Sequence, residues 1–132
     1  MVYGEQRGAA FSDYDADGRV DLAISQNGAA TKLYHNIAAK PGLRVRLVGP
    51  KGNPSGVGAT IRIVYPDGYG PAREVHSGSG YWSQDSMVQV MGLRDNVTGI
   101  WVRWPGGHIT EMDVRPGEKE IAVKFDKKLT PQ

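Results

Sequence analysis

Residues 13–21 read D-Y-D-A-D-G-R-V-D, and this acidic segment carries the strongest chemical signal in the sequence. Asp13, Asp15, Asp17 and Asp21 stand at loop positions one, three, five and nine, with Gly18 at position six. Carboxylates at alternate positions point their oxygens inward when a chain curls round an ion, and Ca²⁺ accepts about six to eight oxygens. Gly18 permits the sharp bend because a positive φ costs glycine little. The spacing therefore predicts a Ca²⁺ site.

The carbonyl of Arg19, at loop position seven, would add a further oxygen to the four predicted carboxylate ligands. Like charges about 4 Å apart repel by about 1–4 kcal/mol, depending on the dielectric, so clustered carboxylates are unfavourable without a cation. The alternative is a solvated turn, since Asp and Gly are ordinary turn residues. Mg²⁺ stays open although it usually keeps more of its water, whereas Zn²⁺ is disfavoured without Cys or clustered His ligands.

The segment differs from an EF-hand loop, which needs a Glu at position twelve and flanking helices. Position twelve is Ile24, and the flanking residues have the pattern of strands. A nine-residue loop that leads into a strand beginning at Asp21 fits better.

Aromatic residues in the second half of the chain form a weaker candidate site. They could line a groove that stacks sugar rings or an apolar ligand, although packing in a core is the favoured interpretation. Trp82 is the best exception, since it lies next to Tyr81 in a loop rich in Gly and Ser, where an exposed aromatic would suggest binding. The candidate residues of this groove are Tyr81, Trp82, Trp101 and Trp104, with Arg73, Gln84 and Asp85.

The sequence contains no constellation that points to catalysis. His35, His76 and His108 fall on different predicted strands and have no nucleophile near them in sequence, so surface or capping roles are favoured. A hydrolase with an Asp-bound metal would need an open coordination position and a base in a pocket, and no such pattern is visible. We therefore expect a protein that is not an enzyme.

These residues must be positioned by strands, because apolar residues alternate with polar ones along short segments. Such segments lie at 43–48, 59–64, 100–104 and 121–125, with further candidates at 21–26, 31–37, 72–77, 87–91 and 108–114. Eighteen Gly and eight Pro residues interrupt every window long enough for a helix. We expect an all-β fold, an antiparallel sandwich or a barrel-like meander with an N-terminal calcium-loop hairpin. The expected units are residues 1–40 and 41–126, followed by a frayed tail at 127–132.

Composition excludes several classes of function. The 132 residues include no Cys, which excludes disulfides and a Cys nucleophile. A net charge of +2 is too small for nucleic-acid or membrane binding to be the default. No apolar run is long enough for a membrane helix, and the N-terminus lacks the pattern of a signal peptide.

Two parts of the chain resemble known families. The stretch R-G-A-A-F-S-D-Y-D-A-D-G-R-V-D-L-A-I-S-Q-N-G, followed by L-Y-H-N, is similar to one FG-GAP/VCBS repeat. The later segments L-R-V-R-L-V-G-P-K-G-N, G-V-G-A-T-I-R-I, R-E-V-H-S-G-S-G-Y-W-S-Q and V-R-W-P-G-G resemble an ASPIC/UnbV domain. The resemblance implies a Ca²⁺-binding module of extracellular or cell-surface proteins, without established catalysis.

The chain holds a single repeat of this kind, whereas a propeller needs at least about four blades. Because a lone hairpin is marginal in water, we expect it to associate, most simply as a C₂ homodimer. The expected function is a non-enzymatic calcium-binding β module for binding, adhesion or assembly, with a protein or glycan partner. The alternative is a carbohydrate- or peptide-binding domain that uses Tyr81 and Trp82, with the acidic loop structural only.

Overall fold

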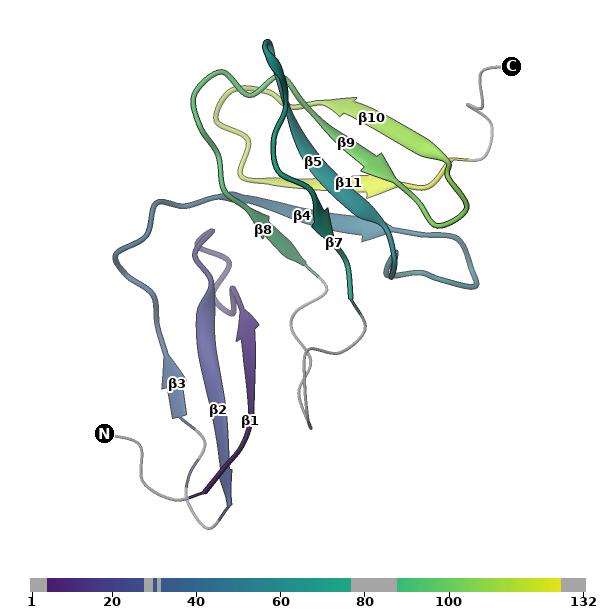
Figure 1. Cartoon of the computed structure of the whole chain (residues 1–132). Helices are drawn as coiled ribbons and strands as arrows, with labels where there is room; N and C mark the ends of the chain where they lie inside the picture. The colour runs from purple at the N-terminus through teal and green to yellow at the C-terminus, as the bar shows by residue number, and fades with distance from the viewer. Residues whose placement is uncertain (1–4, 28–29, 31, 77–87, 127–132) are drawn as a thin grey trace.

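A computed structural model of the chain describes residues 5–27, 30, 32–76 and 88–126. This part of the chain is all-β, as the alternating pattern predicts, with eleven strands in three sheets and no helix (Figure 1). It therefore contains no helix that could cross a membrane. The first sheet has the order β1-β2-β3, and its strands are β1 (Glu5–Ser12), β2 (Asp21–Asn27) and β3 (Lys32–Tyr34).

The other two sheets face each other as a sandwich, which is one of the two expected architectures; the barrel does not form. One sheet has the order β10-β9-β5-β6, with β7 also paired to β5, and the other has the order β11-β4-β8. Their strands are β4 (Leu43–Val48), β5 (Thr60–Tyr65), β6 (Gly68–Tyr69), β7 (Arg73–Glu74), β8 (Gln89–Met91), β9 (Gly99–Arg103), β10 (Ile109–Asp113) and β11 (Glu120–Lys124).

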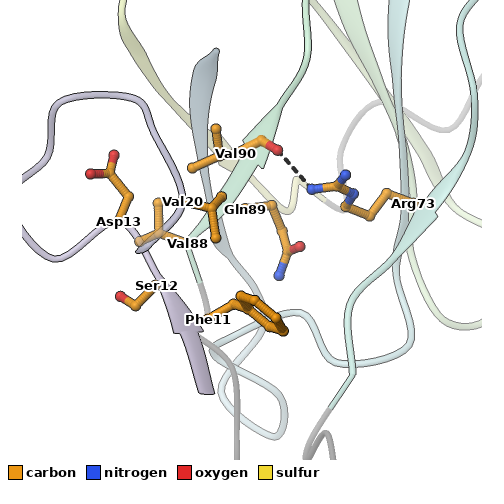
Figure 2. Close-up of a pocket in the computed structure, with 8 residues that line it drawn as sticks. All are labelled: Phe11, Ser12, Asp13, Val20, Arg73, Val88, Gln89 and Val90. Carbon is orange, nitrogen blue, oxygen red and sulfur yellow. Dashed lines mark hydrogen bonds between the residues drawn. The ribbon is translucent and has the colours of Figure 1, made fainter. Parts of the chain in front are cut away.

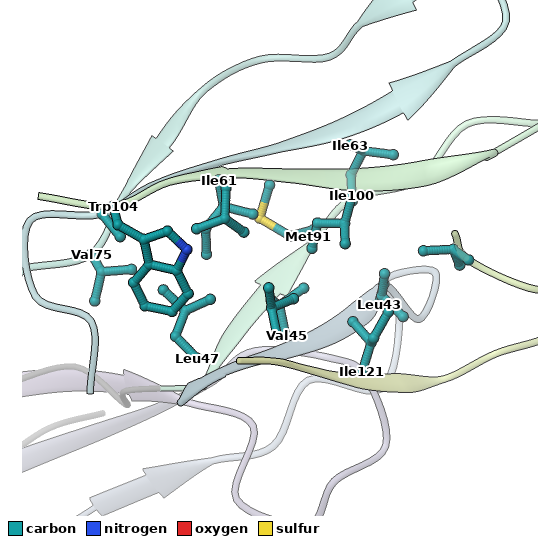
Figure 3. Close-up of a cluster of buried hydrophobic side chains, with 14 of the residues drawn as sticks. Leu43, Val45, Leu47, Ile61, Ile63, Val75, Met91, Ile100, Trp104 and Ile121 are labelled. Atoms are coloured by element: carbon teal, nitrogen blue, oxygen red, sulfur yellow. The ribbon is translucent and has the colours of Figure 1, made fainter. Parts of the chain in front are cut away.

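The core lies between these two sheets because alternate residues of their strands point inward (Figure 3). Trp104, just after β9, is 2% exposed, and its indole N–H donates to Thr110 Oγ1 at 2.9 Å. The buried apolar set is Leu43, Val45, Leu47, Ala59, Ile61, Ile63, Tyr65, Val75, Met91, Ile100, Val102, Trp104, Val114, Ile121 and Val123. Hydrophobic burial between the two sheets therefore stabilises the second part of the chain.

Strand pairing differs from expectation in one place. All the pairs between described strands are antiparallel except β11 and β4, which pair parallel from Glu120 opposite Arg44 to Lys124 opposite Val48. The chain crosses from one sheet to the other between β10 and β11, so β11 joins a strand far away in sequence. Local alternation carries no information about the direction of such a partner.

The sheet β1-β2-β3 contributes nothing to this core among the described residues, since the buried apolar set begins at Leu43. Phe11 pairs with Leu22, and Leu22 pairs with Tyr34, so these three side chains share one face of the sheet. Phe11 is 52% exposed and Tyr34 is 42% exposed. The first sheet therefore leaves part of its apolar surface exposed, although Phe11 also lies beside residues of the sandwich.

Candidate metal centre

The acidic loop joins β1 to β2, and the hairpin register brings its two ends together. Ser12 at the end of β1 pairs with Asp21 at the start of β2. Asp13 and Asp21 therefore lie close to each other, and they are 7% and 2% exposed. Buried carboxylates need hydrogen bonds or counter-charges, and the loop supplies both.

The Asp13 carboxylate organises the loop by accepting two backbone N–H groups. Asp17 N–H donates to Asp13 Oδ1 at 3.0 Å, and Gly18 N–H donates to Asp13 Oδ2 at 2.8 Å. The guanidinium of Arg44, at the start of β4, lies at the same carboxylate, with Nε 3.0 Å from Oδ2. Asp13 thus links the loop to the first strand of the sandwich.

The geometry of the Arg44 pair is that of an ion pair rather than a hydrogen bond. Its Nε is buried without a hydrogen-bond partner, although the Asp13 oxygen is close enough for charge attraction. Its Nη1 lies 3.4 Å from Glu120 Oε2 on β11. The short distance still gives attraction, because the attraction between charges depends less on angle than a hydrogen bond does.

The Asp21 carboxylate ties the hairpin to the segment that follows β3. It accepts the backbone N–H of Tyr14 at 3.3 Å on one oxygen and that of Asn36 at 2.7 Å on the other. The side chain of Asn36 donates in turn to the carbonyl of Val20 at 3.2 Å. Three segments of the chain therefore meet at one buried carboxylate.

Asp15 and Asp17 face His35, which follows β3. The His35 Nε2 lies 2.9 Å from Asp15 Oδ2 and 3.2 Å from Asp17 Oδ2. The hydrogen bond to Asp17 raises the pKa of His35 above its usual value. For Asp17, desolvation opposes ionisation, but hydrogen bonds from the Arg19 backbone, His35 and the Arg19 side chain outweigh it and lower the pKa to about 2. The hydrogen bonds from Arg19 and His35 therefore favour the anionic form of Asp17.

The donor atoms of the loop converge in two overlapping groups. Oxygens of Asp13, Asp15 and Asp17 lie within 4.8 Å of one another, and so do donor atoms of Asp15, Asp21 and His35. Together the two groups contain all four predicted carboxylates, with Asp15 in both. The structure also pairs Arg19 with Asp17 through its side chain, 3.1 Å from Nη1 to Oδ2.

Backbone conformation follows the expected bend. Gly18 has a φ of 82°, and a Cβ there would lie 3.0 Å from the carbonyl oxygen of Gly42. The backbones of Gly18 and Gly42 lie this close because the Gly42 N–H donates a hydrogen bond to the Gly18 carbonyl at 2.8 Å. Glycine is therefore required at position six by both its φ and the approach of the linker to β4.

A small cavity of about 100 Å³ lies beside the loop, between the first sheet and the sandwich (Figure 2). Phe11, Asp13 and Val20 line one side. Arg73 lies on the other side and donates from Nη1 to the Val90 carbonyl at 2.7 Å. The remaining lining residues are Ser12, Val88 and Gln89. A cavity this small has room for a few waters or one side chain.

The predicted aromatic groove is divided by the structure. Tyr81 and Trp82, with Gln84 and Asp85, lie outside the described residues. Packing accounts for Trp104 but not for Trp101, which is half-buried on the outer face of β9. The two residues are three positions apart, so period-two alternation places them on opposite faces of the sheet.

Sequence reasoning missed three residues that the fold brings to the acidic loop: His35, Asn36 and Arg44. Their contacts depend on how β3 and β4 approach the hairpin, and no local spacing encodes that approach. His35 and Asn36 do belong to the L-Y-H-N segment. This segment follows the hairpin closely in the sequence, which is the one signal that could have predicted their contacts with the loop. His76 and His108 lie elsewhere, near Glu74 and against Phe125.

Comparison with known families covers most of the sandwich, from the residue that follows β4 to a few residues beyond β11. The family described as ASPIC and UnbV matches residues 49–129. The chain belongs to the ASPIC and UnbV family. The family match begins after the acidic loop and after β4, so the evidence for a role of the loop comes from its own residues.

One curated relative is Cartilage acidic protein 1 of Xenopus tropicalis, which is 28% identical over 120 residues. The aligned region covers 87% of this chain and 18% of that protein. The chain thus spans about a fifth of the length of this relative.

Proposed function

We propose that this chain is a non-catalytic β module that binds Ca²⁺ in its acidic loop. The ion would be held by the carboxylates of Asp13, Asp15, Asp17 and Asp21, with the Arg19 carbonyl as a further ligand. The convergence of carboxylate oxygens within 4.8 Å is the observation that carries the proposal. The resemblance of residues 7–28 to an FG-GAP/VCBS repeat supports it.

The donor set fits a hard divalent cation. Carboxylate oxygens outnumber the single imidazole nitrogen of His35, and Ca²⁺ prefers oxygen ligands whereas Zn²⁺ prefers nitrogen and sulfur. Arg19, His35 and Arg44 pair with carboxylates of the loop, which is consistent with a site that attracts positive charge. The bound ion would supply a double positive charge there and connect the hairpin to β4 through Asp13.

The proposal assigns no catalysis to the loop. The carboxylates of Asp13 and Asp21 accept hydrogen bonds from backbone N–H groups. The carboxylate of Asp17 makes hydrogen bonds with the side chains of Arg19 and His35. Carboxylates held in this way are suited to fixing a loop rather than to accepting a substrate proton. Stabilisation of the fold is thus the expected consequence of binding.

Thermal unfolding with Ca²⁺ or with a chelator tests the proposal. A ligand at one hundred times its Kd stabilises the folded state by about 2.7 kcal/mol, so we expect Ca²⁺ to raise Tm by about 5–15 °C. Asp15→Asn should abolish most of the increase, because Asp15 is exposed and belongs to both groups of converging donors.

Asp67→Asn is the matched control, since Asp67 is an exposed carboxylate that pairs with Arg94 at 2.7 Å, far from the loop in the fold. It should leave the response to Ca²⁺ unchanged. Identical melting curves of the wild type in Ca²⁺ and in chelator would contradict the proposal and leave the acidic loop structural only. An equal response to Mg²⁺ would contradict the choice of ion.

We also propose that the first sheet mediates assembly, most simply of two copies of the chain. The partial exposure of the apolar side chains of Phe11 and Tyr34, on either side of half-buried Leu22, is the observation that favours it. A three-stranded sheet with one apolar face needs a covering layer for stability. The oligomeric state of the chain in solution tests this part of the proposal.

A further inference from the structure

The outer face of the sheet β10-β9-β5-β6 gathers aromatic and charged side chains around Trp101. Along β5, Ile61 and Ile63 are buried while Arg62 between them is half-buried on the opposite side. Along β9, Trp101 alternates in the same way with buried Ile100 and Val102. These alternating patterns place Arg62 and Trp101 on the face that points away from the core.

Four strands contribute one side chain each to a cluster, which we name the Trp101 face: Arg62, Tyr69, Trp101 and Glu111. In the register of the sheet, Trp101 stands opposite Arg62 on β5 and opposite Glu111 on β10. The Tyr69 ring centroid lies 5.9 Å from that of Trp101, and Arg62 Cζ lies 5.9 Å from the indole centroid. Tyr69 donates its hydroxyl to Glu111 Oε1 at 3.1 Å.

The charges around the two rings alternate in sign. Arg62 and Arg103 form no ion pair with an acid among the described residues, and they lie on the same face as Glu111 and Asp113. A ligand of strong single charge would meet repulsion from one half of this surface. Interleaved donors and acceptors instead match a neutral ligand whose groups both donate and accept hydrogen bonds.

The two strands at the centre of this face have no free backbone for a peptide strand to pair with. Trp101 lies on β9, which is hydrogen-bonded to β5 on one side and to β10 on the other, and Arg62 lies on β5, between β9 and β6. Strand addition needs an exposed sheet edge, and in this sheet the edges are β10 and β6, on either side of Trp101 and Arg62 (Figure 1). Recognition here must use side chains alone, which favours a ligand other than an extended peptide.

We propose that the Trp101 face binds a neutral oligosaccharide. Sugar rings present C–H groups to the electron-rich faces of Trp101 and Tyr69, since an aromatic ring is negative on its face. Their hydroxyl groups accept from Arg62 and Arg103 and donate to Glu111. Tyr69 is 53% exposed and Trp101 is half-buried, so the sugar residues would lie on the surface of the sheet, across its strands.

This inference goes beyond the calcium function and is independent of it. The strands β5, β6, β9 and β10 supply no residue to the acidic loop, so a calcium site that fails its test would leave the Trp101 face intact.

The test is an NMR titration of the full chain, labelled with ¹⁵N, with soluble hexasaccharides of β-1,4-glucose, β-1,4-mannose, β-1,4-xylose and N-acetylglucosamine. We expect at least one of them to shift the indole N–H signal of Trp101 saturably. Trp101→Ala should weaken binding at least tenfold, and Trp101→Phe less, because it keeps a ring. Arg62→Ala should weaken binding about threefold to tenfold at unchanged Tm, so the result does not depend on one variant that fails to fold.

Arg46→Ala is the matched control, since Arg46 is an exposed arginine on the outer face of the opposite sheet and should have no effect. Four outcomes would overturn the proposal. In the first two, no hexasaccharide at 10 mM shifts the Trp101 signal, or binding survives Trp101→Ala but is lost in Trp82→Ala. In the other two, protein concentration alone shifts the Trp101 signal, or an acidic or neutral peptide shifts it and a sugar does not. Titrations in Ca²⁺ and in chelator should agree, and a requirement for Ca²⁺ would also contradict the proposal.

Discussion

Ala16 occupies the fourth position of the acidic loop with a φ of 61°, in the left-handed region. A residue with a Cβ pays about 1–2 kcal/mol there, while glycine adopts this conformation readily. Ala16→Gly should therefore stabilise the chain by about 0.5–1 kcal/mol, after the larger entropy of the unfolded glycine chain is subtracted. Denaturant unfolding measures the change.

The matched control for this prediction is Ala72→Gly. Ala72 is exposed and has no positive φ, so its replacement by glycine should be neutral or destabilising. Equal effects of the two substitutions would show that strain at Ala16 makes no contribution.

Arg44 and Asp13 connect the loop to the sandwich as a mostly buried pair, with side chains 14% and 2% exposed. Removing one partner of a buried pair leaves the other charge uncompensated and costs about 3–5 kcal/mol. In chelator, Arg44→Met and Asp13→Asn should each destabilise the chain, and the double variant should cost less than their sum by about 1–3 kcal/mol. Unfolding free energies of the four proteins form the double-mutant cycle, and strict additivity would contradict the coupling.

At the scale of elements, the sandwich and the first sheet differ in how they bury apolar residues. The sandwich strands alternate buried and exposed residues and close over one core. The first sheet pairs its strands, with one register shift between Gln6 and Gly8 on β1, but leaves Phe11 and Tyr34 exposed. Hydrogen bonding alone holds such a sheet weakly, since most stability comes from burial.

A matched pair of isoleucine substitutions measures this difference. Ile61 on β5 is fully buried, and Ile24 on β2 is half-buried in the first sheet. Ile61→Ala should cost about 2–5 kcal/mol of unfolding free energy because it leaves a cavity, whereas Ile24→Ala should cost about 1 kcal/mol or less in dilute solution. Similar costs for the two variants would show that the first sheet is covered as well as the core is.

At the scale of the whole molecule, the exposed apolar face of the first sheet predicts self-association. Sedimentation velocity over a range of concentrations should show a dimer, and Phe11→Ser with Tyr34→Ser should shift it to monomer. Tyr69→Ser is the control, since Tyr69 is an exposed aromatic on a different sheet. A monomer at all concentrations, with the fold intact, would contradict assembly of two copies.

The region that Cartilage acidic protein 1 of Xenopus tropicalis shares with this chain covers 18% of that relative. A module of this size can act as one part of a larger protein, with the sandwich as its folded unit. The acidic loop is placed where the first sheet meets that unit, through the Asp13 pair with Arg44 and the hydrogen bond from Gly42 to Gly18. Ion binding there would act on the connection between the two parts.

The sequence by itself determined the all-β class, the alternation of core residues and the loop that carries the carboxylates. These features are local: side chains alternate with period two along a strand, and Asp13, Asp15 and Asp17 lie within five residues. Only the tertiary structure decided the rest, because it depends on segments far apart in the chain. The approach of β3 and β4 brings His35 and Arg44 to the loop, the crossover to β11 makes one pair parallel, and the pairing of β5, β6, β9 and β10 assembles the face around Trp101.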